Sequence, residues 1–585
     1  MRILFDIESK VSEGKTDLIS RTEDVFIIVT KNLDDRDEVI THYNIEDGIR
    51  YLHCAHEIIG HNIIGYDLPV LNKLYDFEFV GKITDTLMMS RLVYPNRRER
   101  DHLYRQPELD SRLYGSHSLK AWGQRLHFNK GDYGETENAW QKLTEEMVEY
   151  CKQDVELTHK LYSILYSKLQ SEDALQLEQN LTVICNRQEA DGMPFDVDKA
   201  QELYAVLCGR RSELETELVD KFGTWYTGEL REPKTKPAYS KLIKVTFNPR
   251  SRQHIAKRLK DFYNWKPTEF TPSGEPKVDE SVLSTMEYPE AKLLTEYLLV
   301  NKRISQLAEG DQAWLKLERL GRIHGRINTM GSVTSRCSHS HPNLAQIPNV
   351  SAPYGKECRS LFTAPKGFSF LGVDVSGLEL RCLAHYMALY DSGEYGKKLL
   401  EDDIHTVNQR AAGLQSRNDA KRFIYAFLYG AGDEKIGEIV GGDSQTGARI
   451  KKKFLAQIPA LGKLRTAVQN KSKQGYIKGL DGRHIPVRSE YGALNTLMQS
   501  AGAIICKRWV VEFHKLLKER GFDNGTDYQQ VAFVHDELQL IVKDQHAERI
   551  GQTAVEAIQI SGDKYGFRIP LTGEYKCGQS WADTH

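Results

Sequence analysis

The sequence lacks the features that mark membrane, secreted or zinc-ribbon proteins. No apolar run is long enough to cross a bilayer, and an acid interrupts the short apolar stretch that opens the chain. The nine cysteines are scattered singly with no CxxC pair, so neither a zinc site nor a disulfide framework is expected. Internal repeats and low-complexity tracts are absent as well. These absences predict a protein of a reducing compartment, the cytoplasm.

The chain also has little net charge, −2 over 585 residues, so its charge balance does not by itself indicate nucleic acid. The distribution of the charges does. Residues 231–260 carry ten Lys or Arg against one acid, and residues 449–465 carry six against none. Cations at this density can replace the counterions of a phosphate backbone. The alternative to nucleic-acid binding is an ordinary solvated surface of mixed charge. Neither patch alone excludes that alternative.

Composition and hydrophobic pattern predict a globular enzyme of roughly three or four domains. Strand-like runs and a long amphipathic helix at 143–169 indicate an α/β domain over the first 165 or so residues. The next stretch, to about residue 308, is helical at both ends, and its middle, Thr227 to Phe247, is expected to be an exposed connection. In the remainder the pattern predicts strands at 367–376 and 529–542 and helices at 416–430, 445–474 and 492–518.

Two separate carboxylate clusters lie near the two ends of the chain. In the first, Asp6 and Glu8 end an apolar run that looks like a strand, so their side chains share a face. Asp67 follows in HNIIGYDL, and Tyr150 and Asp154 lie four apart on one face of a helix. Each acid alone is most simply a surface charge. As a set they suit two hard cations, which take oxygen ligands.

In the second cluster, Asp374 ends the strand-like segment GFSFLGVDVS, and Asp536 and Glu537 lie between apolar runs, as in a hairpin turn. Adjacent buried acids are costly without a counter-ion, so flanking strands this apolar favour a metal. A plain solvated turn is the alternative, and the acidic pair alone does not decide between them.

The helix expected at 416–430 favours the metal site. Arg417, Lys421, Tyr425 and Tyr429 recur every four residues and form one slowly drifting stripe. Two cations followed by two aromatic rings suit a nucleoside triphosphate. An ordinary amphipathic helix accounts for the tyrosines but not for cations on the same stripe. The pattern therefore indicates phosphoryl chemistry run twice on one polymer, with the first cluster cutting a nucleic acid and the second extending it.

The first cluster resembles the D-x-E, N-x-x-x-Y-D and Y-x-x-x-D motifs of the proofreading 3′–5′ exonucleases. The resemblance spans the first domain. It implies that the four acids Asp6, Glu8, Asp67 and Asp154 hold two divalent cations, one to generate hydroxide and one to stabilise the leaving 3′ oxygen. It also implies that Tyr150 orients the attacking water.

The rest of the chain resembles the family A DNA polymerases, and within them the replicative polymerases of phage T7 and its relatives. DVSGLELR matches the first palm motif, RNDAKRFIYAFLYG the fingers helix and VHDE the last palm motif. Further similar stretches are GMPFD, FNPRSRQHI, TSRCSHSHPNLAQIP, DIHT, KGLDGR and ALNTLMQSAGA. The likeness covers nearly the whole chain. It implies a DNA-templated DNA polymerase with a proofreading exonuclease and a replicative role in a phage.

The fold class that follows from this resemblance is α/β and α+β multidomain, with an RNase H-like exonuclease domain followed by a right-hand polymerase. The expected bounds are 1–168 for the exonuclease domain, 169–308 for the thumb and connecting helices, 309–388 for the first part of the palm, 389–491 for the fingers and 492–585 for the second part of the palm.

The resemblance also assigns a metal site in the palm. Asp374, Asp536 and the backbone carbonyl of Val375 are expected to bind two magnesium ions, for which manganese can substitute. Glu537 is expected to support them at the edge of the site. Preorganised cations near developing charge are worth several kcal/mol.

Further roles concern the nucleotide and the DNA. Arg417, Lys421 and His405 are expected to grip the triphosphate, and Lys421 to protonate the leaving pyrophosphate. The other expected nucleotide contacts are Tyr425 by the sugar, Tyr429 by the templating base pair and Glu379 against a 2′-hydroxyl. The expected DNA contacts are Arg336, Asn495 and Gln499 in the minor groove, where correct pairs offer acceptors in like positions, and His535 at the primer terminus.

One departure concerns the partners. In the T7 enzyme a long thumb insertion binds host thioredoxin, whereas only twenty residues separate Tyr226 from Phe247 here. Thioredoxin is therefore not expected. The expected partners are primer–template DNA, dNTPs, a replicative helicase–primase and a single-strand binding protein, with the chain a monomer in the host cytoplasm. By hypothesis, the basic patch from Arg231 to Lys260 holds duplex DNA directly.

Two other functions stay open. A template-directed RNA polymerase on a related palm is opposed by Glu379 and Tyr425, and comparing dNTP with NTP incorporation would separate it. A nucleic-acid-binding scaffold with inactive metal sites is opposed by the complete carboxylate sets.

Overall fold

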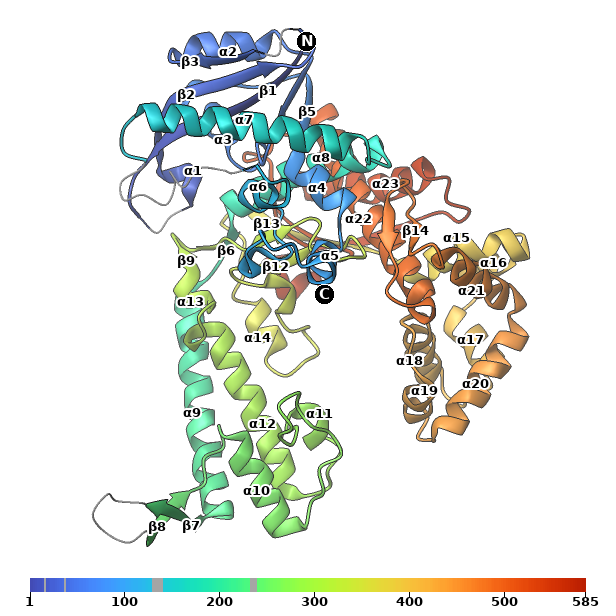
Figure 1. The fold of residues 1–585 in the computed structure, drawn as a ribbon. Coiled ribbons are helices and arrows are strands. Elements are labelled where there is room, and N and C mark those ends of the chain that lie inside the picture. Colours follow the sequence, from blue (N-terminus) through green and yellow to red (C-terminus); the bar gives the residue numbers. More distant parts are fainter. Residues whose placement is uncertain (15–16, 36–37, 129–139, 232–238) are drawn as a thin grey trace. The chain divides into compact units, whose positions relative to one another are not determined.

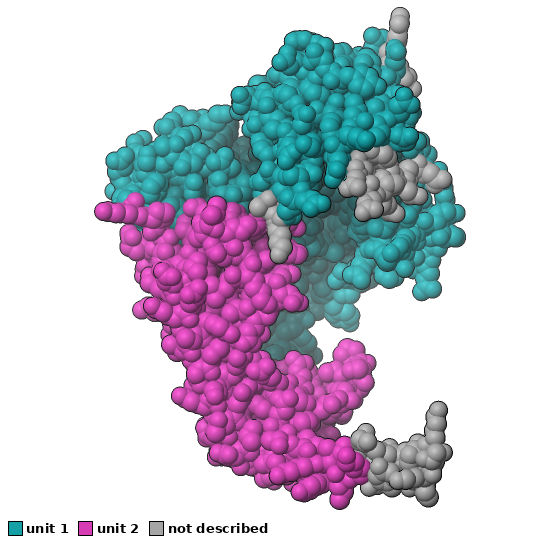
Figure 2. All heavy atoms as spheres, turned by 90° about the vertical axis from the view of Figure 1, so that its left-hand side faces the viewer, with its two compact units in different colours: residues 1–191, 327–339, 367–577 teal, residues 192–326, 340–366, 578–585 magenta. Residues whose placement is uncertain are grey.

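The computed structural model describes residues 1–14, 17–35, 38–128, 140–231 and 239–585. The chain forms two compact units, coloured separately in Figure 2: unit 1 holds residues 1–191, 327–339 and 367–577, and unit 2 holds residues 192–326, 340–366 and 578–585. Among the helices in the described ranges, none is both long and apolar enough to span a membrane.

Unit 1 begins with a five-stranded mixed sheet, the N-terminal sheet, of order β3-β2-β1-β4-β5. Its strands are β1 (Arg2–Val11), β2 (Thr22–Asn32), β3 (Val39–His42), β4 (Glu57–Gly60) and β5 (Lys82–Asp85). The central strand β1 runs antiparallel to β2 and parallel to β4. Alternate β1 side chains feed two cores: Leu4 packs into one, and Ile3 and Phe5 into the other. A strand covered on both faces is apolar throughout, which explains its continuous hydrophobic run.

Helices cover both faces of this sheet (Figure 1). The predicted long helix is confirmed as α7 (Glu145–Tyr166), which contacts β1 and begins where the Thr144 hydroxyl accepts a hydrogen bond from the Met147 N–H. On the opposite face, α3 (Asp67–Tyr75) packs through Val70 and Leu71. The other helices are α1 (Leu18–Arg21), α2 (Ile45–His53), α4 (Thr86–Val93), α5 (Arg97–Tyr104) and α6 (Leu119–Arg125).

A second sheet in unit 1, the C-terminal sheet, has the order β16-β17-β13-β18. Its strands are β13 (Phe368–Val375), β16 (Tyr528–Val534), β17 (Glu537–Lys543) and β18 (Gly573–Gly578), and its helices are α15 (Leu378–Asp391), α22 (Ala493–Glu519) and α23 (Ala547–Lys564). The strands predicted at 367–376 and 529–542 are confirmed. Strand β18 approaches β13 so closely that a Cβ at Gly573 would lie 2.5 Å from the Asp374 carbonyl oxygen.

Between α15 and α22 lies a helical region that packs around Phe423, Phe427 and Phe454. It consists of α16 (Glu394–Glu401), α17 (Ile404–Ala412), α18 (Arg417–Leu428), α19 (Asp433–Ile439), α20 (Ser444–Gln457), α21 (Pro459–Ser472), β14 (Tyr476–Lys478) and β15 (His484–Pro486). The single helix predicted at 445–474 is wrong, because Pro459 starts a new helix. Proline lacks the N–H that an interior turn needs and fits the first turn instead.

Helix α8 (Glu172–Asp191) joins the cores of the two sheets of unit 1. Its Leu175 packs into an N-terminal core, whereas Leu181 packs into the C-terminal one. Between them the fully buried Glu178 accepts hydrogen bonds from Arg483 and from Lys507 of α22. A buried carboxylate paired with two cations is costly to disturb, so it fixes α8 in place.

Unit 2 is mainly helical, with α9 (Val197–Phe222) and α12 (Pro289–Ile304) side by side (Figure 1). It also contains α10 (Arg252–Tyr263), α11 (Glu280–Leu283), α13 (Trp314–Leu317), α14 (Gly355–Arg359), the short sheet of β6 (Met193–Pro194), β10 (Arg322–Ile323) and β9 (Glu318–Arg319), and the hairpin of β7 (Thr224–Arg231) and β8 (Tyr239–Thr246).

The hairpin corrects one prediction. Thr227 to Phe247 was expected to be an exposed connection, yet most of it pairs in the antiparallel ribbon β7–β8. Its inner face packs on α10, where the Arg258 guanidinium lies 4.3 Å from the centre of the Trp225 ring. Lys241 and Lys244, both exposed on β8, weakened the apolar signal of a strand. The nearby Lys234 and Lys236 lie outside the described residues.

Candidate functional site

The first carboxylate cluster forms where β1, α3 and α7 meet. The Ile7 backbone N–H, between Asp6 and Glu8, donates to Asp67 Oδ1 at 3.3 Å, so the first residue of α3 lies beside the strand pair. From α7, the Cys151 thiol donates to Asp6 Oδ2 at 3.6 Å. Ligand atoms of Asp6, Glu8 and Cys151 all lie within 4.8 Å of one another. Sequence reasoning treated Cys151 as one of nine scattered cysteines and missed its place here.

Electrostatics adds Asp154 to this cluster, called the N-terminal site below. Burial raises the pKa of the Cys151 thiol, and the negative charges of Asp6, Glu8 and Asp154 raise it further. Burial also raises the pKa of Asp67 to about 7. Acids gathered at this density repel one another and favour protonation. Their oxygen donors fit hard divalent cations, whose positive charge would offset that repulsion.

Tyr150 lies next to this site on α7. Its side chain is half-buried, and its ring meets the Trp140 ring edge-on with centroids 6.1 Å apart. The predicted Tyr150–Asp154 face of the helix is therefore present, with Asp154 buried and Tyr150 towards the surface.

Asp85 is a residue that sequence reasoning missed. It is fully buried, accepts hydrogen bonds from the backbone N–H groups of Asn62 at 2.9 Å and Ile64 at 3.1 Å, and caps α4 through the Leu87 N–H at 2.8 Å. The carboxylate thereby fixes the loop that leads into Asp67. The signal in the sequence was its position just before a helix, where aspartate is a preferred cap.

The second cluster forms at one end of the C-terminal sheet. Asp374 lies opposite Glu537 in the antiparallel register of β13 and β17. The Val375 N–H donates to the Asp536 carbonyl oxygen at 3.2 Å, which holds the β16–β17 turn against the end of β13. The predicted hairpin turn is confirmed, and His535 within it has a φ of 60°, a left-handed conformation unusual for a side chain of its size.

The acids of this cluster act on each other electrostatically. Burial raises the pKa of Asp374 to about 7, and the charges of Asp536, Glu537 and Glu379 add to the rise. Burial likewise raises the pKa of Asp536 to about 6, with Glu379 the next cause and Arg336 acting in the opposite direction. These four acids are called the C-terminal site below. All their donors are oxygens, which fit a hard divalent cation.

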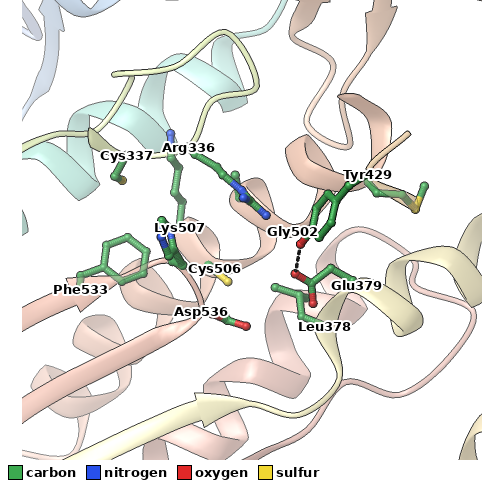
Figure 3. A pocket seen from close by; sticks show the side chains of 13 residues that line it. Arg336, Cys337, Leu378, Glu379, Tyr429, Gly502, Cys506, Lys507, Phe533 and Asp536 are labelled. Atoms are coloured by element: carbon green, nitrogen blue, oxygen red, sulfur yellow. Dashed lines mark hydrogen bonds between the residues drawn. The ribbon is translucent and has the colours of Figure 1, made fainter. Parts of the chain in front are cut away.

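A pocket opens beside the C-terminal site. Figure 3 shows Arg336, Glu379, Tyr429, Cys506 and Asp536 among the residues that line it. The Tyr429 hydroxyl donates to Glu379 Oε1 at 3.0 Å, which connects the end of α18 to the first turn of α15. His535 lines the same pocket. The structure thus brings the predicted Arg336, Glu379, Tyr429 and His535 together with the acids.

The predicted stripe on α18 is present. Arg417 and Lys421 are exposed and Tyr425 is half-buried. The His405 ring lies 6.3 Å from the Tyr425 ring, centre to centre. Burial lowers the pKa of His405, and the charges of Arg417 and Lys421 lower it further, so a neutral His405 ring lies near these two cations at one end of the stripe. At the other end of the stripe, burial raises the pKa of Tyr425 to about 12. Glu379, Tyr429 and Asp536 raise it further.

Arg417 has a partner that the sequence did not reveal. Its Nη2 donates to Asp403 Oδ1 at 3.0 Å, and its Nε donates to Oδ2 of the same carboxylate. This guanidinium holds the pKa of Asp403 well below its usual range. Both side chains are exposed, and an exposed ion pair contributes little to stability, so Arg417 can exchange this partner for a phosphate.

The last two expected DNA contacts, Gln499 and Asn495, lie four residues apart on α22. Thr334 Oγ1 donates to Gln499 Oε1 at 3.4 Å, which ties the segment before Arg336 to α22. Asn495 lies instead in a different pocket, which Arg465 and Tyr491 also line.

Comparison with known proteins agrees with this geometry. The sequence profile of DNA polymerase family A matches residues 225–583. The DNA-directed DNA polymerase of Escherichia phage T7 is 38% identical in an alignment 650 residues long. The alignment covers 90% of this chain and 92% of the phage protein. The corresponding enzyme of Enterobacteria phage T3 has the same identity and coverage.

More distant proteins share the fold. The thermostable DNA polymerase I of Thermus thermophilus is 26% identical over 73% of this chain and 50% of its own length. Among solved structures, the POL domain of Pol1 from M. smegmatis in complex with DNA primer-template and dNTP has a TM-score of 0.77 at 18% identity, covering 99% of this chain and 96% of that one. On the profile match and the phage relatives, the chain belongs to DNA polymerase family A.

Proposed function

We propose that this DNA-directed DNA polymerase extends a primer 3′ end at the C-terminal site and removes 3′-terminal nucleotides at the N-terminal site. One observation supports the synthetic half most strongly. Asp374 and the Asp536–Glu537 turn meet across antiparallel strands, and the α18 stripe leads from them to the cations Arg417 and Lys421 beside His405. In a replicative enzyme of a phage, extension would copy the DNA and 3′-terminal removal would correct copying errors.

At the C-terminal site, Asp374, Asp536 and the Val375 carbonyl would hold two magnesium or manganese ions, with Glu537 supporting them. When bound, such ions supply a charged clamp on the attacking and leaving oxygens of an in-line displacement. Lys421 and His405 would bind the triphosphate, and Arg417 would join them after leaving Asp403. Lys421 Nζ would donate a proton to the leaving pyrophosphate oxygen.

Selection of the nucleotide would depend on the aromatic end of the α18 stripe, at Tyr425 and Tyr429. Tyr425 would pack against the sugar and Tyr429 against the templating base pair. Glu379, held by the Tyr429 hydroxyl at 3.0 Å, would exclude a 2′-hydroxyl. A carboxylate fixed in this way rejects a bulkier sugar by steric and electrostatic conflict, which is how specificity against a close competitor is achieved.

At the N-terminal site, Asp6, Glu8, Asp67 and Asp154 would hold the same kind of ions in an RNase H-like exonuclease domain. The central position of β1 in a mixed sheet, with α7 across it, supports this reading. Tyr150 would orient the attacking water.

DNA contacts and partners complete the proposal. Arg336, Gln499 and Asn495 would contact the minor groove of primer–template DNA, and His535 the primer terminus. The subdomain bounds are proposed as stated from the sequence, with thumb, palm and fingers after the exonuclease domain. Only twenty residues lie between Tyr226 and Phe247, so thioredoxin is not among the proposed partners. A monomer that works with a helicase–primase and a single-strand binding protein is proposed.

Single substitutions at the two sites test the proposal. Asp536→Asn should abolish extension of a labelled primer–template and leave its degradation intact. Asp6→Ala should abolish degradation and leave extension intact. If neither substitution changes either activity, both assignments fail. If extension proceeds equally with NTPs, the choice of DNA as product fails.

A further inference from the structure

A buried lysine holds the start of the segment that carries Arg336, and no role has been assigned to it. Lys507 of α22 is 1% exposed, and its Nζ donates to the Thr329 carbonyl oxygen at 2.7 Å and to Glu178 Oε1. Thr329 is 2% exposed. A lysine in this position has given up its hydration, so the carbonyl and the carboxylate must replace it. The bond to Thr329 is therefore part of what keeps the charge buried.

The segment from Thr329 to Arg336 is tied to its surroundings at two further points. The hydroxyl groups of Thr329 and of Thr182 on α8 lie 3.1 Å apart, within hydrogen-bonding distance. Five residues along the segment, Thr334 Oγ1 donates to Gln499 Oε1 of α22 at 3.4 Å. Helices α8 and α22 thus hold the segment near both of its ends.

Between these ties the segment is closed by its own hydrogen bonds. The Arg336 N–H donates to Ser332 Oγ at 2.9 Å, and the Ser335 N–H donates to the Ser332 carbonyl oxygen at 3.0 Å. A turn closed in this way moves as one piece, so a shift at Thr329 should be carried to Arg336. Figure 3 shows that Lys507 and Arg336 line the same pocket beside the C-terminal site.

The charge of Lys507 is not needed to neutralise Glu178. Arg483 also donates to Glu178, and the same guanidinium is paired with Asp481. In the described part of the chain, Lys507 is the one of these two cations that also bonds Thr329. Without Lys507, Glu178 would keep a cationic partner, whereas the Thr329 carbonyl would lose its charged donor.

We propose that Lys507 is a positioning residue for the minor-groove contact of Arg336. By holding the Thr329 carbonyl, it sets where the Arg336 guanidinium meets the last primer base pair. This inference rests on the proposed function of Arg336 and names the group that places it. The minor-groove acceptors of a base pair occupy fixed positions, and a hydrogen bond weakens steeply when its geometry is lost. Loss of Lys507 should therefore make extension insensitive to the minor-groove acceptor while Arg336 is still present.

The probe is a primer whose 3′-terminal guanine is replaced by 3-deazaguanine, which pairs normally but lacks the N3 acceptor. The unsubstituted full-length protein should extend this primer at least about tenfold less efficiently than the ordinary one, measured as kcat/KM for the next dNTP. Arg336→Ala should remove this difference. Lys507→Met should reduce it to about threefold or less. Thr182→Val removes a neutral bond to the same Thr329 and should give a smaller reduction.

Arg483→Met is the matched control. It removes the other cation of Glu178 and leaves the bond from Lys507 to Thr329 in place. Because it breaks the same buried network, it should destabilise the protein to a similar extent, which chemical denaturation of each variant measures. Its preference for the ordinary primer should nevertheless stay within about twofold of that of the unsubstituted protein.

A full preference for the ordinary primer in Lys507→Met, or an equal loss of it in Arg483→Met, would overturn the inference. If Lys507→Met does not fold, Thr182→Val takes its place, and an unchanged preference there would also overturn it. No preference in the unsubstituted protein, or a preference that survives in Arg336→Ala, is a different result. It would remove the minor-groove role of Arg336 from the proposed function, and the role of Lys507 with it.

Discussion

The two carboxylate sites of this chain differ in how they are enclosed. In the N-terminal site, Glu8, Asp67 and Asp154 are 6%, 4% and 5% exposed, and they come from one strand and two helices. In the C-terminal site, Asp374 reaches solvent and the two acids of the β16–β17 turn are half-buried. The first site is thus assembled by tertiary packing, and the second by one strand end and one hairpin.

The difference teaches what each site can accept. An open carboxylate cluster beside the exposed cations of α18 suits a triphosphate that arrives from solvent and leaves as pyrophosphate. An enclosed cluster suits the end of a chain that is threaded in. Packing also brings the Cys151 thiol into contact with Asp6 in the N-terminal site.

The largest effect is expected where the two regions join. Glu178→Gln leaves Lys507 without its buried carboxylate and Arg483 with Asp481 alone, and removing one partner of such a network costs about 3–5 kcal/mol. Chemical denaturation should show this loss in the free energy of unfolding. On heating, extension and degradation should be lost together, because α8 carries both cores.

The control for that experiment is Glu172→Gln on the exposed start of the same helix, where a change within about 0.5 kcal/mol is expected. If Glu178→Gln inactivates only one of the two activities on heating, the two regions are more independent than α8 suggests.

The second largest effect separates the chemistry of extension at the C-terminal site from degradation at the N-terminal site. Lys421→Ala should slow single-turnover nucleotide incorporation on the order of 10²-fold, because it removes a general acid, and should leave degradation unchanged. Arg422→Ala changes the neighbouring cation, off the stripe, and should have little effect. Equal losses in both variants would mean that general positive charge, and not the position of Lys421, is what matters.

A smaller effect concerns the choice of sugar. Glu379→Ala should reduce the preference for dNTP over NTP at least about tenfold, measured as a ratio of kcat/KM values. Tyr429→Phe keeps the ring and removes only the hydroxyl that donates to Glu379, so its reduction should be smaller. A preference unchanged in Glu379→Ala would remove this residue from nucleotide selection.

The smallest effect is expected in unit 2. Lys241 and Lys244 are exposed on β8, and replacing both by alanine should reduce the slope of log affinity against log salt by about 1.8 for duplex DNA. The same double change at Lys515 and Lys518 of α22 should leave the slope unchanged. If the β8 variant keeps its salt sensitivity and product length, even with Lys234 and Lys236 also neutralised, the hairpin does not hold duplex.

Local pattern predicted the hairpin and the helix that lie at the C-terminal site. Apolar runs on both sides of Asp536 made a hairpin the simplest reading, and the stripe from Arg417 to Tyr429 needed only helical spacing. Both features are visible to sequence because neighbours in the chain create them. The convergence of Asp374 and Asp536 came from family resemblance, and the register of β13 and β17 explains it.

Contacts between segments far apart in the chain could not be predicted from the sequence. The Cys151–Asp6 contact joins residues 145 positions apart, and the Arg417–Asp403 pair depends on how two helices meet. The β7–β8 hairpin was missed because the exposed Lys241 and Lys244 of β8 lowered its apolar signal. In each case tertiary packing determines the structure, and a local sequence pattern does not contain that information.

Anomalous diffraction from crystals grown with manganese, primer–template DNA and a non-reactive dNTP analogue would test the central claim directly. We expect manganese peaks between Asp374 and Asp536, in contact with the triphosphate, and a separate peak between Asp6 and Glu8. A nucleotide bound elsewhere, or manganese absent from the space between Asp374 and Asp536, would contradict it.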